Sequence, residues 1–154
     1  MTDIDQLLAS LNIVLPTPPL AVANYVPYVI EGNRVIISGQ LPINEGRVTF
    51  KGKIAQEVSL EEGQTAARLC AINILTQLKD ACSGDLSRVQ KCLRLGGFVN
   101  CNPDFVDHSM VINGASDLMV EVFGEKGRHA RAAIGVSSLP LGAAVEIEAT
   151  FLIN

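Results

Sequence analysis

Residues 130–153 read ARAAIGVSSLPLGAAVEIEATFLI and carry the clearest pattern of the chain. Two segments, Ala130 to Ser137 and Ala144 to Ile153, are rich in β-forming residues, and the turn Leu139-Pro-Leu-Gly142 joins them. In the second segment Glu146 and Glu148 are two residues apart. They therefore point to one face of a strand, while the apolar residues around them point to the other. Glutamates in so apolar a strand need polar or charged partners. The strand is therefore a candidate for part of a binding site.

The turn predicts that the two strands pair as an antiparallel hairpin. In that register Arg131 shares a face with Glu146 and Glu148. The small side chains of Ala133 and Gly135 then leave a hollow between the guanidinium and Glu146, which lie about 13 Å apart at ~3.3 Å per residue. A small ligand fits such a hollow. The alternative interpretation is a structural diagonal pair of Arg131 with Glu148, and a one-residue slip in register removes the shared face.

Upstream of residue 130, hydrophobic spacing predicts two main helices and further strands. The first helix begins with a capping box, Ser59-Leu-Glu-Glu62, and the second runs from about Ser109 to Phe123. The predicted strands are Asn24 to Ile30, Arg34 to Leu41, Arg47 to Phe50 as an added edge, and Ser87 to Asn100. This order predicts an α+β fold: a mixed sheet of five or six strands with both main helices on one face.

Composition limits the chain to one domain and excludes several classes of function. The 154 residues are 48% hydrophobic and 18% charged, with a net charge of −4. A net negative chain lacks the basic field that collects nucleic acid or an anionic membrane surface, so neither partner is expected. Residues 1–20 are predicted as an accessory helix, Asp3 to Leu11, followed by a proline-rich linker. So much apolar surface on a small domain predicts self-association.

The cysteines and histidines give no metal-ligand spacing. Cys70, Cys82, Cys92 and Cys101 form no C-x-x-C pair, and they are interpreted as buried thiols in a reducing compartment, the cytoplasm. The start Met-Thr-Asp-Ile-Asp lacks the pattern of a secretory signal. The two histidines, at positions 108 and 129, are candidate general bases, but each lies near a helix end and is interpreted as a solvated or capping residue. No metal and no cofactor are predicted.

Two motifs at opposite ends of the chain resemble one family. The stretch Asn33-Arg-Val-Ile-Ile-Ser-Gly-Gln-Leu-Pro42 is similar to a signature of the RidA or YjgF-like reactive-intermediate deaminases, a family also labelled endoribonuclease L-PSP. The residues Ala130-Arg131, Leu139-Pro140 and Val145-Glu-Ile-Glu-Ala149 resemble the same family's C-terminal pattern, with matching spacing from Arg131 to Glu146. The resemblance covers roughly residues 21–152.

The resemblance implies a chorismate-mutase-like protomer that forms a homotrimer, with a cleft between each pair of subunits. It implies hydrolysis of 2-enamino and 2-imino acids to 2-keto acids and ammonia, without a cofactor. Arg131 matches the arginine that grips the substrate carboxylate, and Glu146 matches the glutamate that positions or activates water. Tyr25, Gly39 and Asn113 match further substrate-binding positions of the family.

The chain departs from the family pattern in three places. Ala133 occupies the substrate-side position where many members have a reactive cysteine, the loop from Cys101 to Ile112 is longer, and the segment before Ala21 is an addition. Two other functions therefore stay open beside the deaminase. One is a non-catalytic trimer that binds small carboxylates for regulation. The other is a ribonuclease, which the sequence favours least because aromatic residues for base stacking are few and no basic cluster is dense.

Overall fold

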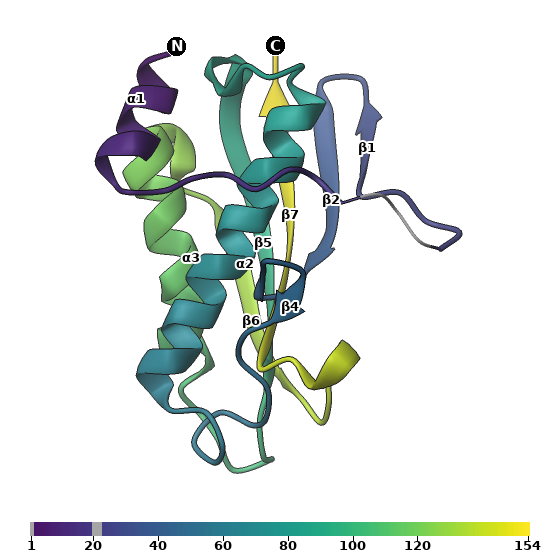
Figure 1. Cartoon of the computed structure of the whole chain (residues 1–154), viewed down its shortest axis with the longest axis vertical. Coiled ribbons are helices and arrows are strands. Elements are labelled where there is room, and N and C mark those ends of the chain that lie inside the picture. The colour runs from purple at the N-terminus through teal and green to yellow at the C-terminus, as the bar shows by residue number, and fades with distance from the viewer. Residues whose placement is uncertain (1, 20–22) are drawn as a thin grey trace.

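The computed structural model describes residues 2–19 and 23–154, and it shows a mixed sheet covered on one face by two long helices (Figure 1). The helices are α2 (Leu60–Ala81) and α3 (His108–Phe123). The main sheet contains β1 (Tyr28–Glu31), β2 (Arg34–Gln40), β5 (Val89–Asn100), β6 (Ala130–Val136) and β7 (Val145–Ile153). The predicted α+β class, with a mixed sheet and both main helices on one face, is confirmed.

The first long helix begins as its capping box predicts. The Ser59 hydroxyl accepts from the backbone N–H of Glu62 at 3.1 Å, and the Glu62 carboxylate accepts from the backbone N–H of Ser59 at 3.1 Å. Two backbone donors that the helix itself cannot satisfy are thereby paired. The helix ends before Gly84, whose φ of +91° takes the chain out of the helical direction.

The predicted pairing of the last two strands is wrong. The sheet order is β1-β2-β7-β5-β6, so β5 lies between β6 and β7, parallel to the first and antiparallel to the second. The turn that was expected to close a hairpin, now η3 (Pro140–Gly142), instead carries the chain past the end of β5. There the Asn100 side-chain amide donates to the carbonyl of Ala143 at 3.1 Å. A 12-residue strand with seven buried residues gains more from two partners than from an edge position.

Strand pairing assigns each residue to one of the two faces of the sheet. The buried residues of β7 alternate strictly with partly exposed ones, and they meet α2 and β5 in one core. On the opposite face, the apolar side chains of Val29, Ile36 and Ile134 are each about half exposed, at 49%, 48% and 48%. The apolar composition of the chain predicts self-association, and this face offers an apolar surface for it.

The N-terminal segment packs back onto the domain. The accessory helix is α1 (Asp3–Ser10), capped by Thr2, and Asp5 accepts from the Lys79 ammonium of α2 at 2.8 Å. Hydrogen bonds from Lys79 and Thr2 lower the pKa of Asp5 to about 2. The chain then crosses the outside of α2 toward the sheet (Figure 1). Among residues 2–19 and 23–154, no helix has both the length and the apolar character to span a membrane.

The strand predicted from Arg47 to Phe50 is not an edge strand of the main sheet. Arg47 and Val48 form β4 (Arg47–Val48), which pairs only with β3 (Ile43–Asn44) in a separate two-stranded sheet. The Asn73 amide of α2 donates to the carbonyls of Leu41 and Ile43, both at 3.0 Å. These bonds hold the small hairpin on the helix rather than on the main sheet.

Close approach of the two long helices requires a glycine in α3. A Cβ at Gly114 would overlap the backbone carbonyl oxygen of Gln64 in α2. Gly114 therefore sets the spacing of α2 and α3, and through it the position of α3 over the sheet.

We predict that Gly114→Ala lowers the free energy of unfolding by about 2 kcal/mol, because overpacking outweighs the gain in helix propensity. The matched control is Asp117→Ala at an exposed position of the same helix, which gains propensity without a clash. Urea unfolding measures both variants. An alanine at position 114 that stabilises the chain as much as one at position 117 contradicts the close contact.

Candidate functional site

The side chain of Arg131 lies on the helix-covered side of the sheet, against α3. Arg131 is opposite Leu95 of β5, which is opposite Ala149 of β7, and both of these partners are buried in the core. Its Nη1 donates to Oδ1 of Asn113 at 2.8 Å and to Oγ of Ser116 at 3.1 Å. The structure therefore brings two of the predicted site residues, Arg131 and Asn113, into direct contact.

The contact with Ser116 opens a longer polar network that the sequence did not predict. Ser116 Oγ lies 2.8 Å from Nε2 of His129, and Nδ1 of that ring lies 2.6 Å from the carbonyl oxygen of Gly127. Burial lowers the pKa of His129, and the nearby charge of Arg131 lowers it further. Asn113 and Ser116 are three residues apart and so share one helix face. That spacing, together with a histidine two residues before Arg131, is the only signal in the sequence.

Glu146 lies on the other face of the sheet, beside Gly39. A Cβ at Gly39 would collide with Oε1 of Glu146 and would lie 3.0 Å from its Cδ. These two predicted site residues are therefore also in contact. Burial raises the pKa of Glu146, and the neighbouring carboxylate of Glu148 raises it further. A carboxyl group with a raised pKa holds a transferred proton better than an ordinary glutamate does.

The prediction that Arg131 shares a face with the two glutamates is wrong. Glu148 is opposite Gly96 of β5, which is opposite Ala132 of β6, so both glutamates belong to the face that Arg131 does not occupy. The alternative pair of Arg131 with Glu148 is wrong too, because Oε1 of Glu148 faces Nη1 of Arg94 at 3.6 Å. Because β5 lies between β6 and β7, Arg131 pairs with Leu95 rather than with a residue of β7. Its side chain therefore lies on the helix-covered face and not on the face of the glutamates.

The hollow predicted over Ala133 and Gly135 of β6 is filled at its Gly135 end. A Cβ at Gly135 would lie 2.7 Å from Nε2 of His108 and 2.8 Å from Sγ of Cys101, whose side chains occupy that space. A cavity of about 390 Å³ opens beside this pair. Ala133 packs partly against the core. The space near Arg131 is therefore bounded at its far end by Cys101, which follows β5, and by His108 at the start of α3.

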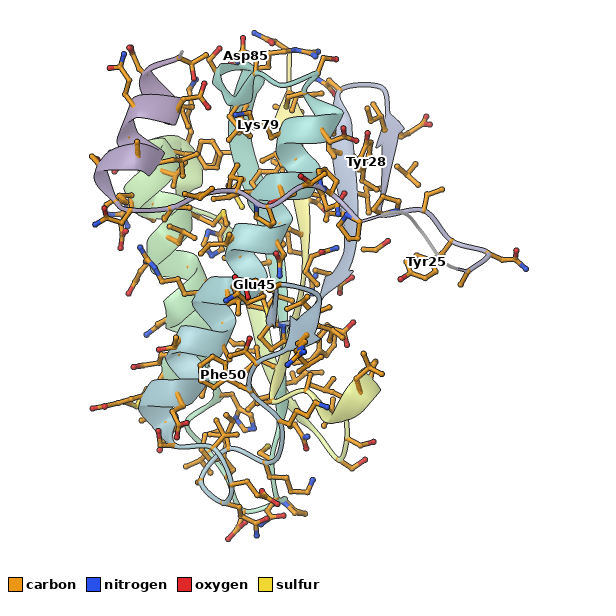
Figure 2. All side chains as sticks on the ribbon, in the orientation of Figure 1. Tyr25, Tyr28, Glu45, Phe50, Lys79 and Asp85 are labelled. Atoms are coloured by element: carbon orange, nitrogen blue, oxygen red, sulfur yellow. The ribbon has the colours of Figure 1, made fainter. Side chains whose placement is uncertain are left out.

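Tyr25 lies apart from the other predicted site residues. It is 58% exposed, on a loop before β1 that projects away from the body of the domain (Figure 2). Tyr28, in contrast, turns toward α2, where its hydroxyl donates to Asp80 at 2.7 Å. The structure thus places the predicted residues in three regions: Arg131 with Asn113, Glu146 with Gly39, and Tyr25 alone.

Neither a second cavity nor the cysteines add to these groups. A cavity of about 570 Å³ lies between the N-terminal segment, α2 and the β3–β4 hairpin, and none of the predicted site residues lines it. Cys70, Cys82, Cys92 and Cys101 are free and buried. Within the described part of the chain, no three His, Cys, Asp or Glu residues are grouped closely enough to hold a metal ion.

The chain is thus an α+β protein with a mixed sheet, two helices on one face of it, and an arginine of the edge strand β6 held by the second helix. Residues 5–149 match the family model described as "YjgF/chorismate_mutase-like, putative endoribonuclease". The chain belongs to this family, which confirms the resemblance found in its two motifs.

The chain is similar to proteins with and without solved structures. The chain is 46% identical to Protein TCP17 of Trypanosoma cruzi over 148 residues, 96% of this chain and 92% of that protein. It is 47% identical to Atu1372 of Agrobacterium tumefaciens, with a TM-score of 0.92 over 98% of this chain and 92% of that one. E. coli TdcF, solved with bound serine, shares the fold at 21% identity and a TM-score of 0.64, over 92% and 98% of the two chains.

We predict that Gly39 and Glu146 are energetically coupled. Gly39→Ala should displace the carboxylate and lower the free energy of unfolding, and the loss should largely disappear in the background of Glu146→Ala. The double-mutant cycle should give an interaction of about 1 kcal/mol. Repeating the cycle with Glu148→Ala supplies the control, since that side chain meets Gly96 instead. Strict additivity of Gly39→Ala with Glu146→Ala contradicts the contact.

Proposed function

We propose that this chain hydrolyses 2-enamino and 2-imino acids to 2-keto acids and ammonia, at clefts between the subunits of a homotrimer. The observation that carries the proposal is a partly exposed guanidinium, Arg131, fixed on one side by Asn113 and Ser116. Arginine pairs bidentately with a carboxylate, so a guanidinium held in place defines where the adjacent C2 atom of a 2-imino acid lies.

Separation of the two polar groups supports a site shared between subunits. In one protomer Arg131 and Glu146 occupy opposite faces of the sheet, so a single ligand that needs both must lie between two copies. The half-exposed apolar face that carries Glu146 gives the copies a surface on which to associate. A small acid bound at Arg131 would then meet Glu146 of the partner subunit.

The chemistry of the proposed reaction suits these two residues. A protonated imine is already electrophilic at C2, so the protein needs only to place water beside that carbon and to move protons. Glu146, with its pKa raised by burial, can accept a proton from water and return it to the departing ammonia. Family membership supports this reaction class, and TdcF, with the same fold, holds serine, which is also a small α-carboxylate.

Non-catalytic binding of small carboxylates is the second candidate function. It requires Arg131 and its α3 partners but not Glu146, and the direct contacts within one protomer favour it. A ribonuclease has weaker support, because the net charge of −4 does not attract a phosphate backbone.

Light scattering should give a particle of about three times 16.4 kDa. Complementation then tests the shared cleft. Arg131→Ala and Glu146→Gln should each inactivate the homotrimer, whereas subunits of the two variants that are unfolded, mixed and refolded together should regain part of the activity. Hybrid trimers contain clefts with both native residues. A stable monomer, or a mixture no more active than its parts, contradicts the shared site.

Substitutions at the two residues should separate binding from turnover. Glu146→Gln keeps its shape and hydrogen bonding but cannot accept a proton, so it should bind 2-ketobutanoate normally and turn over freshly generated 2-iminobutanoate at least ~10²-fold more slowly. Arg131→Ala should lose both properties, and Arg131→Lys should recover only a small part. Calorimetry and ammonia release measure the two effects. Undiminished turnover in Glu146→Gln shows that another group activates water.

A further inference from the structure

We propose that Ser116 and His129 are positioning residues, which hold the guanidinium of Arg131 in the orientation that receives a substrate carboxylate. Neither residue belongs to the two motifs that identify the family. The groups that make the contacts are a hydroxyl and an imidazole ring. Their role in activity rests on the proposed function, whereas the hydrogen-bond network itself is a property of the folded chain.

The direction of each hydrogen bond follows from the one partner that cannot donate. The Gly127 carbonyl, 2.6 Å from Nδ1 of His129, only accepts, so Nδ1 carries the proton. In a neutral ring Nε2 is then an acceptor, and the hydroxyl of Ser116 donates to it at 2.8 Å. With its hydrogen committed, Oγ of Ser116 presents its lone pairs to Nη1 of Arg131 at 3.1 Å. The Gly127 carbonyl, acting through His129, thus determines how the Ser116 hydroxyl is oriented toward Arg131.

The charges around the ring favour the neutral tautomer that this network requires. His129 is half-buried, and burial is the largest cause that lowers its pKa. Arg131 of β6, two residues further along the chain, and Lys91 of β5 are the charged groups that lower it further, while the bond to Gly127 opposes them. The hydroxyl of Ser116 on α3 is uncharged. The lowered pKa favours the neutral ring, in which Nε2 accepts from Ser116.

Two acceptors on one nitrogen fix the arginine more firmly than one. Asn113 and Ser116 lie on the same face of α3, and both accept from Nη1 of Arg131. Both hydrogens of Nη1 are then used, and the N–H groups on Nε and Nη2 are left for a carboxylate. A free arginine side chain loses rotamer entropy when it binds a ligand, and fixing it beforehand removes part of that cost.

Nitrogen-15 NMR of the full-length protein tests the network without reference to activity. At pH 7.5, His129 should show a protonated Nδ1 and an unprotonated, hydrogen-bonded Nε2. The Nε–H order parameter of Arg131 should fall in Ser116→Ala and stay unchanged in Ser109→Ala, an exposed serine of the same helix. A protonated Nε2 at that pH, or an unchanged order parameter in Ser116→Ala, overturns the proposal.

Binding and turnover test the consequence for substrate. Ser116→Ala and His129→Ala should each raise the KM for 2-iminobutanoate and the Kd for 2-ketobutanoate roughly tenfold, the effect of losing one hydrogen bond to a charged group. The kcat should change less than about twofold. His129→Gln should restore most of the affinity, because its amide oxygen can accept from Ser116.

Each pattern of results separates this proposal from the proposed function. A fall in kcat at unchanged KM overturns the positioning role and places Ser116 in the chemistry. Loss of affinity in His129→Gln equal to that in His129→Ala overturns the acceptor role of the ring. If the wild-type protein neither binds 2-ketobutanoate nor releases ammonia, the proposed function fails, and the NMR measurements alone decide the network.

Discussion

Insertion of β5 between β6 and β7 is the constraint on which the rest of the structure depends. The strand uses both of its edges, parallel to β6 and antiparallel to β7, and its buried residues lie against α3. Every side chain of β6 is assigned to a face through β5. Arg131 therefore points to the helices and Glu146 to the open face, although only 15 positions separate them in the sequence.

This division of the polar groups connects the fold with the proposed chemistry. Helix α3, which holds Arg131, packs closely on α2 at Gly114. Gly39 in turn leaves space for the carboxylate of Glu146 on the other face. Near each half of the site, a glycine thus permits a close contact. The proposed function joins the halves through a second copy, and the apolar open face provides the contact surface.

Local signals in the sequence predicted the elements well and their partners poorly. The capping box at Ser59 located the start of α2 because its hydrogen bonds lie within four residues. The turn at Leu139 to Gly142 was interpreted as a hairpin because a short connection between strands usually closes one. Yet β5, some 40 residues upstream, occupies that position. The network of Ser116 with His129 was missed for the same reason: it joins α3 to a residue that precedes β6.

The sequence by itself determined the α+β class, the two main helices and most of the strands, although β1 begins at Tyr28 rather than at Asn24. These follow from periodicity, capping and motif spacing, which depend on neighbouring residues. Only the tertiary structure decided which face each residue occupies, that His108 and Cys101 fill the space over Gly135, and that His129 reaches Arg131 through Ser116. The physical reason is that strand order depends on the burial of β5 by distant segments, which no local pattern specifies.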